Sequence, residues 1–270
     1  MLIKRVITAI VVLPGIIFLI LQRDKLGFSI AIAVVSILTF YEYLEIVTLI
    51  CSGVISRKVK ALSYLVCAGI VAGVLFTSMA GILALIGFNT LFLGFIVMLD
   101  FSRDDYIFDV ISKQVLGIVY IPFSLCLLVL IYSYDNGHLY VLWLLFVVFA
   151  NDTGAYYAGS FYGKRHLAPN ISPKKTYMGA VGGVVGSVLT GFLLYYLFFH
   201  SLEKALVAIP CSVLISVAGQ VGDLFASALK RAAGVKDSGR ILPGHGGMLD
   251  RIDGLLFAIP VLYVLRMFIL

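Results

Sequence analysis

The chain has 270 residues, of which 61% are hydrophobic and 13% are charged, and its mean hydropathy is +1.08. Soluble domains contain about 25% charged and about 45–50% apolar residues. This composition therefore excludes an ordinary soluble globule, a disordered chain and a disulfide scaffold. A helix needs about 20 apolar residues to cross a bilayer, so we predict an all-α, polytopic integral membrane protein.

Apolar runs in chain order predict about nine transmembrane helices. The first run follows Lys4 and Arg5 but lacks a small-residue cleavage site, which favours an uncleaved span over a secretory signal. The runs cover residues 6–21, 28–50, 61–79, 81–99, 115–134, 139–158, 177–199, 205–229 and 254–270.

Basic residues are distributed unevenly around these spans. With a cytoplasmic N-terminus, sixteen of the 20 Lys and Arg residues fall on the cytoplasmic side, as the positive-inside rule expects. The net charge of +6 then reflects topology, and no nucleic-acid partner is expected. The four cysteines form no Cys-x-x-Cys pair, so we interpret them as packing or lipid-facing residues. Repeated Gly-x-x-x-Gly spacing over 179–186 predicts close helix packing.

Acidic residues within spans are costly in a bilayer and indicate function by default. Glu42 and Glu45 are three positions apart on one face of a predicted helix. The favoured interpretation is an inter-helix polar contact or a tilted helix end near the interface, because no recognisable chemistry surrounds them. Asp223 differs, since Ser227 and Lys230 follow it at about one-turn intervals. A carboxylate, a hydroxyl and a cation on one helix face are typical of a metal–phosphate site.

The densest polar stretch of the chain covers residues 236–253. Asp250 and Asp253 share a face if the last helix begins there, and their hard oxygens suit Mg²⁺. Glycines at 244, 246 and 247 allow backbone N–H groups to approach an anion. A loop made basic by topology alone would not explain the acids among its cations, which are Lys230, Arg231, Lys236, Arg240 and Arg251.

A second polar group follows the sixth span, beginning with Asn151 and Asp152 and continuing to residues 172–176. The Ser-Pro-Lys-Lys-Thr segment 172–176 predicts the start of the helix 177–199, where free N–H groups attract phosphate. Tyr156 and Tyr157 fit interface aromatics better than base-stacking residues. Both polar groups fall on the predicted cytoplasmic side, which indicates one composite site.

The end of the chain reads Ser227-x-Leu229-Lys230-Arg231-x4-Lys236-Asp237-x-Gly239-x2-Leu242-Pro243-x-His245-Gly246-Gly247-Met248-x-Asp250-Arg251-Ile252-Asp253. This pattern resembles the C-terminal signature of the phosphatidate cytidylyltransferase (CDP-diacylglycerol synthase) family. Residues 151–156 and 172–176 are also similar to that family, and the resemblance covers about residues 139–253. It implies transfer of the CMP moiety of CTP to phosphatidic acid for phospholipid biosynthesis, with pyrophosphate released.

The resemblance also implies a Mg²⁺-dependent enzyme, leaves a second cation at the same site open, and favours a homodimer. It divides the single membrane domain 1–270 into scaffold helices over 1–135 and catalytic helices and cytoplasmic loops over 139–270. The N-terminus and the active site are expected at the cytoplasmic face of the cell (inner) membrane.

The predicted roles follow from the motifs. The lipid phosphate would attack the α-phosphorus of CTP in line, which requires positioning and charge neutralisation more than covalent help. His245 is expected to orient a phosphate or a metal-bound water rather than accept a proton, because a phosphomonoester with a second pKa of about 6 is already ionised. The predicted metal ligands are Asp223, Asp250 and Asp253, and the further catalytic residues are Lys230, Arg231 and His245. The predicted substrate contacts are Asn151, Asp152, Ser172, Lys174, Lys175, Thr176, Ser227, Lys236, Gly246, Gly247 and Arg251.

Two other classes of protein remain as alternatives. A secondary transporter or channel would explain intramembrane acids, but it would not explain phosphate-type loops on one side, and transporters usually show internal repeats, which this sequence lacks. A CTP-using lipid kinase or a CDP-alcohol phosphatidyltransferase is the other alternative. The acidic pattern of the latter begins with Asp-Gly followed two residues later by Ala-Arg, which does not fit the residues after Asp253-Gly254.

Overall fold

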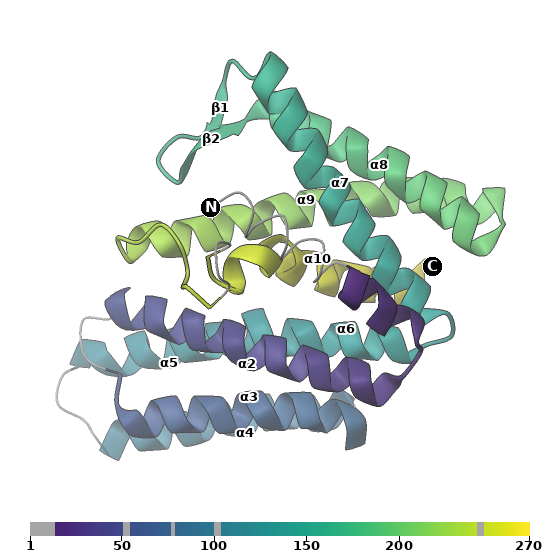
Figure 1. Cartoon of the computed structure of the whole chain (residues 1–270). Helices are drawn as coiled ribbons and strands as arrows, with labels where there is room; N and C mark the ends of the chain where they lie inside the picture. Colours follow the sequence, from purple (N-terminus) through teal and green to yellow (C-terminus); the bar gives the residue numbers. More distant parts are fainter. Residues whose placement is uncertain (1–13, 51–54, 77–78, 100–103, 242–245) are drawn as a thin grey trace. The chain divides into compact units, whose positions relative to one another are not determined.

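The computed structural model describes residues 14–50, 55–76, 79–99, 104–241 and 246–270, and they are helical almost throughout (Figure 1). The all-α, multi-pass membrane class is therefore confirmed. The count of nine spans is supported only roughly, because six helices in the described ranges are long and apolar enough to cross a membrane. These six are Lys25–Ile50 (α2), Met79–Leu99 (α4), Phe108–Ser133, Gly137–Tyr162 (α7), Tyr177–Phe199 (α8) and Leu202–Ala232 (α9).

The chain forms two compact units. One unit combines Met1–Leu130 with Leu229–Arg251, and the other combines Ile131–Ala228 with Ile252–Leu270. Helix α9 and the last helix, α10 (Leu249–Phe268), each contribute residues to both units. We call the unit that contains Met1–Leu130 the N-terminal unit and the unit that contains Ile131–Ala228 the C-terminal unit.

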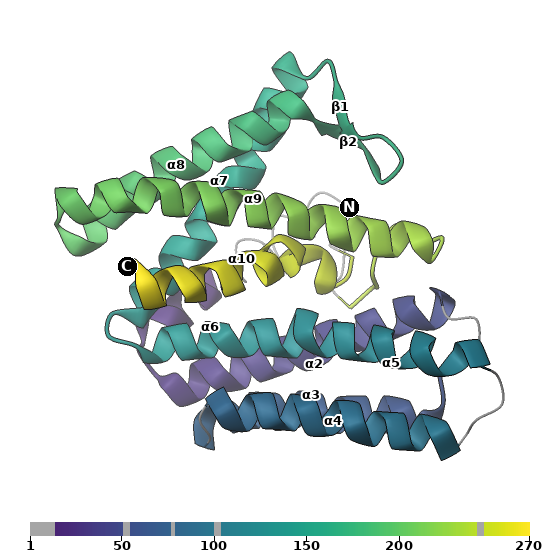
Figure 2. The ribbon, with the colours of Figure 1, turned by 180° about the vertical axis from the view of Figure 1, so that it is seen from behind.

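The N-terminal unit is a packed group of helices in which α3 (Arg57–Phe76) lies beside α2 and α4 (Figure 2). The next helix, α5 (Asp104–Ile118), continues through a π-helical turn, η1 (Val119–Phe123), into α6 (Ser124–Ser133). Pro122 lies in that turn, where its missing N–H fits the wider hydrogen-bond spacing. Polar contacts also join these helices, since the buried amides of Asn89 and Gln114 bond each other at 3.1 and 3.2 Å.

The C-terminal unit is built around the close pair α7 and α8. Backbone meets backbone between them, because a Cβ at Gly154 would lie 2.5 Å from the carbonyl oxygen of Gly182, and one at Gly186 would lie 2.8 Å from that of Ala150. The predicted glycine packing over 179–186 is therefore confirmed. The predicted packing role of cysteines is confirmed for Cys67, Cys126 and Cys211, which are buried and unpaired; Cys51 lies outside the described residues.

A short antiparallel hairpin connects α7 to α8 (Figure 1). Its strands are His166–Ala168 (β1) and Ser172–Thr176 (β2). The prediction that residues 172–176 begin a helix is therefore wrong. Because β1 supplies a partner, Pro173 and the lysines are extended, and α8 begins only at Tyr177, after Thr176. Thr176 caps that helix by accepting a hydrogen bond from the Gly179 N–H at 3.1 Å.

Candidate active site

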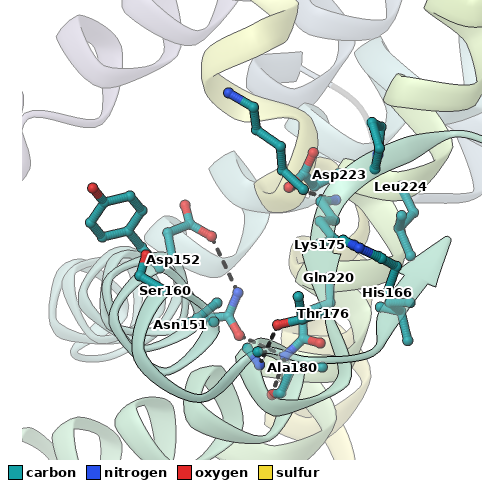
Figure 3. A pocket seen from close by; sticks show the side chains of 18 residues that line it. Asn151, Asp152, Ser160, His166, Lys175, Thr176, Ala180, Gln220, Asp223 and Leu224 are labelled. Carbon is teal, nitrogen blue, oxygen red and sulfur yellow. Dashed lines mark hydrogen bonds and ion pairs between the residues drawn. The ribbon is translucent and has the colours of Figure 1, made fainter. Parts of the chain in front are cut away.

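A cavity of about 570 Å³ lies within the C-terminal unit, bounded by α7, the hairpin, the start of α8 and the middle of α9 (Figure 3). Its size is in the range of small-molecule sites. The structure brings six of the predicted site residues together on its wall, and these are Asn151, Asp152, Lys174, Lys175, Thr176 and Asp223.

An amide network forms one side of this cavity. The Asn151 side-chain oxygen accepts hydrogen bonds from Ser216 Oγ at 2.7 Å and from Gln220 Nε2 at 2.9 Å. Asn151 also donates from Nδ2 to the Asp152 carboxylate at 3.2 Å, and Gln220 donates to the carbonyl of Ala180 at 3.0 Å (Figure 3). The network joins α7, α8 and α9, and it fixes the direction of the Asp152 carboxylate. Sequence reasoning did not assign Gln220, although its place one turn before Asp223 was a usable signal.

An ion pair lies on another part of the cavity wall. Lys175 Nζ on β2 lies 2.7 Å from the Asp223 carboxylate on α9, and their side chains are 25% and 40% exposed. Ser227 Oγ, one turn along α9, lies 3.5 Å from the same carboxylate. The predicted sharing of a helix face by Asp223 and Ser227 is therefore confirmed. The Lys175 nitrogen itself is buried, whereas the Asp223 side chain is 40% exposed. A ligand that enters the cavity can therefore compete with Lys175 for the exposed Asp223 carboxylate.

Asp253 lies beside the turn of α9 that carries Asp223. A Cβ at Gly222 would be only 2.6 Å from the Asp253 carbonyl oxygen, and Gly254 packs against Gly219 one turn away. Glycines on both helices thus allow α9 and α10 to approach backbone to backbone. Two of the three predicted metal ligands therefore come from neighbouring turns of two helices.

A second polar cluster lies in the N-terminal unit, around Asp250. Its Oδ1 accepts a hydrogen bond from Lys230 Nζ at 2.5 Å, and its Oδ2 accepts from the N–H groups of Ser238 at 2.9 Å and Gly247 at 3.1 Å. Asp250 lies outside the six helices that are long and apolar enough to cross a membrane. Burial alone would raise the pKa of its carboxyl, but the Lys230 ammonium and the two N–H donors outweigh burial, so the pKa is lowered. These bonds hold Asp250 ionised at the start of α10.

Glu42 of α2 belongs to this same cluster. Its side chain is 2% exposed, and Oε2 accepts hydrogen bonds from Ser238 Oγ at 3.0 Å and from the Leu249 N–H at 2.9 Å. Glu45, three residues later, is exposed and pairs with Lys60 at 3.3 Å. The expected inter-helix polar contact is confirmed for Glu42, which bonds the first residue of α10. The expectation that no recognisable chemistry surrounds it is wrong, because Glu42 contacts the motif that resembles the family.

The remaining predicted site residues lie in different parts of the structure. Arg231 donates to the Val235 carbonyl at 3.1 Å, and Gly246 has a φ of +86° that favours glycine. Ser172 lies in β2, and Lys236 and Arg251 are exposed. His245 lies outside the described residues. In this structure the Gly247 N–H is used by Asp250, so its contact with substrate stays a prediction.

A metal centre is not preassembled in the described ranges, where no three acidic, His or Cys side chains are grouped to hold an ion. Carboxylate oxygens nevertheless fit Mg²⁺, which usually binds one or two carboxylates together with substrate phosphates. The roles of Asp223, Asp250 and Asp253 as metal ligands stay predictions.

Comparison with known proteins gives a consistent result. The model of the cytidylyltransferase family matches residues 3–269. The chain is 39% identical over 165 residues to a phosphatidate cytidylyltransferase of Staphylococcus haemolyticus, covering 61% of this chain and 60% of the relative. It is 39% identical over 163 residues to a protein of the same name from Thermotoga maritima, covering 58% and 60%, and 39% identical over 164 residues to one from Bacillus subtilis, covering 60% and 61%. The aligned stretches thus span about three fifths of the length of these relatives.

Proposed function

Because the chain belongs to the cytidylyltransferase family, we propose that it transfers the CMP moiety of CTP to phosphatidic acid, giving CDP-diacylglycerol and pyrophosphate. The names of its relatives support this reaction. The observation that carries it is the cavity in the C-terminal unit, where two lysines and two carboxylates face one space of about 570 Å³. That combination fits a nucleotide bound with a divalent cation.

The lysines of the hairpin would receive the triphosphate. Lys174 and Lys175 are on β2, and both line the cavity. When a phosphate enters, Lys175 would exchange its contact with Asp223 for a contact with the anion. The positive charge would reduce the repulsion between the triphosphate and the lipid phosphate, which is the main requirement of phosphoryl-type transfer.

The amide network would orient the rest of the nucleotide. Asn151 is buried, and Gln220 and Ser216 hold its side chain in place. A wall fixed in this way costs little rearrangement when a ligand binds. No general base is required, since the attacking phosphate of phosphatidic acid is ionised at neutral pH.

Mg²⁺ would be held by Asp223, with Asp253 on the neighbouring turn of the same unit. The role of Asp250 as a ligand, inferred from the sequence, stays a separate prediction. The ion would supply neutralisation of charge on the phosphate oxygens. Asp152 on the cavity wall adds a further carboxylate. A second cation at the same site is part of the proposal.

The enzyme would act at the cytoplasmic face of the inner membrane, with its N-terminus on that side. The distribution of Lys and Arg between the predicted loops supports this orientation. Labelling of single cysteines placed in the hairpin and in the α8–α9 turn, with a membrane-impermeant maleimide on intact cells, would test it. We expect the α8–α9 turn to react and the hairpin to be protected; the reverse pattern would contradict the orientation.

A homodimer is proposed from the resemblance alone. Native mass spectrometry of the protein released from nanodiscs would measure the subunit number. A dimer is the expected result, and a monomer with full activity would contradict this part of the proposal.

The reaction itself is tested with the purified protein in nanodiscs that contain phosphatidic acid. With CTP labelled at the α-phosphate, label should enter the lipid and unlabelled pyrophosphate should be released. With CTP labelled at the γ-phosphate, the lipid should stay unlabelled. Transfer of the γ-label would instead indicate a lipid kinase, and no transfer of either label would overturn the proposal and favour a transporter.

A further inference from the structure

Glu42 holds the start of helix α10 and the loop before it. The carboxylate is almost completely buried, and one oxygen, Oε2, accepts from both the Ser238 hydroxyl and the Leu249 N–H. Leu249 is the first residue of α10, and the first N–H groups of a helix have no partner within it. A carboxylate at this point satisfies one of them and interacts favourably with the helix dipole.

The surrounding glycines fit the carboxylate closely. A Cβ at Gly239 would lie 2.8 Å from Glu42 Cδ, and one at Gly247 would lie 2.5 Å from Oε2. Any side chain at either position would push against Glu42. These two motif glycines therefore have a role in packing around Glu42, apart from any approach to a ligand.

Ser238 connects Glu42 to the Lys230–Asp250 pair. Its hydroxyl donates to Glu42, and its N–H donates to the Asp250 carboxylate at 2.9 Å. Gly247, which packs on Glu42, donates to that same Asp250 oxygen at 3.1 Å. Displacement of either Ser238 or Gly247 would thus remove one N–H donor from Asp250, and displacement of both would remove the two donors that the structure shows beside Lys230.

We propose that Glu42 is a positioning residue for the transfer reaction: it fixes Ser238 and the first turn of α10, and through them the Asp250 carboxylate and the Lys230 ammonium. This inference rests on the proposed function. It makes α2, a helix without a recognisable motif, part of the machinery that determines turnover. Both hydrogen bonds go to Oε2, so a side chain with one accepting oxygen at that place is sufficient to hold Ser238 and Leu249.

Three variants test the role by steady-state kinetics in nanodiscs. Glu42→Ala removes the acceptor, and we expect kcat to fall about tenfold or more, as a small misplacement of reacting groups does, while KM for CTP stays within about threefold. Glu42→Gln retains an acceptor oxygen, and Oε1 accepts no hydrogen bond from any residue in the described part of the chain, so kcat should stay within about threefold of wild type. Glu45→Ala is the matched control from the same helix and should leave both constants unchanged.

A double-mutant cycle separates positioning from a general loss of stability. If Glu42 acts through Ser238, then Ser238→Ala should lower kcat in the wild-type background and have little further effect in Glu42→Ala. Independent effects that multiply would overturn the proposal, as would an unchanged kcat in Glu42→Ala. If Glu42→Ala yields no folded protein, the other variants decide. An equal loss of kcat in Glu42→Gln and Glu45→Ala would overturn the proposal. A retained kcat in Glu42→Gln together with a lowered kcat in Ser238→Ala would support it.

Hydrogen exchange gives a readout that does not depend on activity. Glu42→Ala should speed exchange at the Ser238, Gly247 and Leu249 amides, while Glu45→Ala should not. If wild-type protein makes no CDP-diacylglycerol but these amides respond as expected, the proposed function fails and the contact stands. If wild type is active and the amides do not respond, the positioning role fails alone.

Discussion

Two Lys–Asp pairs in this protein have the same chemistry but different surroundings. Lys175 and Asp223 are 25% and 40% exposed beside a cavity, whereas Lys230 and Asp250 are 10% and 11% exposed within a hydrogen-bonded cluster. A partly hydrated pair contributes about 0–1 kcal/mol to stability. Breaking a buried pair costs about 3–5 kcal/mol, because one charge is left without compensation. The first pair is therefore suited to exchange partners with a ligand, whereas the second is held in a fixed position by its surroundings.

The largest effect on activity is expected at Asp223. Asp223→Asn should abolish detectable transfer, since it removes the predicted metal ligand that faces the cavity. Because the Asp223 side chain is 40% exposed, the melting temperature should change little. Transfer of CMP assayed over a range of Mg²⁺ concentrations checks this; appreciable Mg²⁺-dependent activity would refute the role of Asp223 as a ligand.

The largest effect on stability is expected at the buried pair. Lys230→Met should lower the free energy of unfolding by about 3–5 kcal/mol, while Lys175→Met should lower it by about 1 kcal/mol or less. Thermal unfolding of both variants in the same detergent measures the difference. Equal losses of stability would remove the distinction between the two pairs.

A smaller effect is expected on nucleotide affinity. Lys175→Ala should raise KM for CTP about tenfold, since a hydrogen bond to a charged group contributes about 1.5 kcal/mol or more, and kcat should change less. Lys164→Ala, an exposed lysine of the same loop that does not line the cavity, serves as the control. An unchanged KM in Lys175→Ala would place the triphosphate elsewhere.

The smallest effect is a change in acid stability at Asp250. The pKa of the Asp250 carboxyl is lowered in the folded protein. As pH falls below the pKa of an unfolded Asp, about 3.9, the unfolded chain therefore binds a proton more readily than the folded protein does. The stabilisation is therefore complete above that pH and is lost as pH falls through the folded pKa. Acid unfolding of wild type should show this loss, and Asp250→Asn should show a flatter pH dependence in that window. Identical slopes would show that Asp250 does not gain from Lys230.

Much of the fold could be predicted from hydropathy. The run 177–199 has the same bounds as α8, and the predicted ends of α2 and α4 at Ile50 and Leu99 are also observed. The last helix begins at Leu249 rather than at 254. Its first five residues include Asp250, Arg251 and Asp253, and a hydropathy pattern cannot distinguish such a polar helix start from a loop.

The site could be predicted only where its signals are local. The motif residues around Asp223 and Asp250 were visible as polar groups at helical spacing. The hairpin was missed because a strand of three residues has no period to read, and its partner decides its conformation. The partners of Glu42 were missed because Ser238 lies 196 positions away, and no pattern near Glu42 reports such a contact.

The central claim is that the cavity of the C-terminal unit binds the nucleotide, and photo-crosslinking tests it most directly. An azido analogue of CTP would be bound to the protein in nanodiscs, irradiated, and its sites of attachment mapped by peptide mass spectrometry. The account predicts labelling of the segments 151–160, 173–180 and 220–224, reduced by excess CTP and by Lys175→Ala. Labelling that excess CTP suppresses but that lies wholly outside these segments would contradict it.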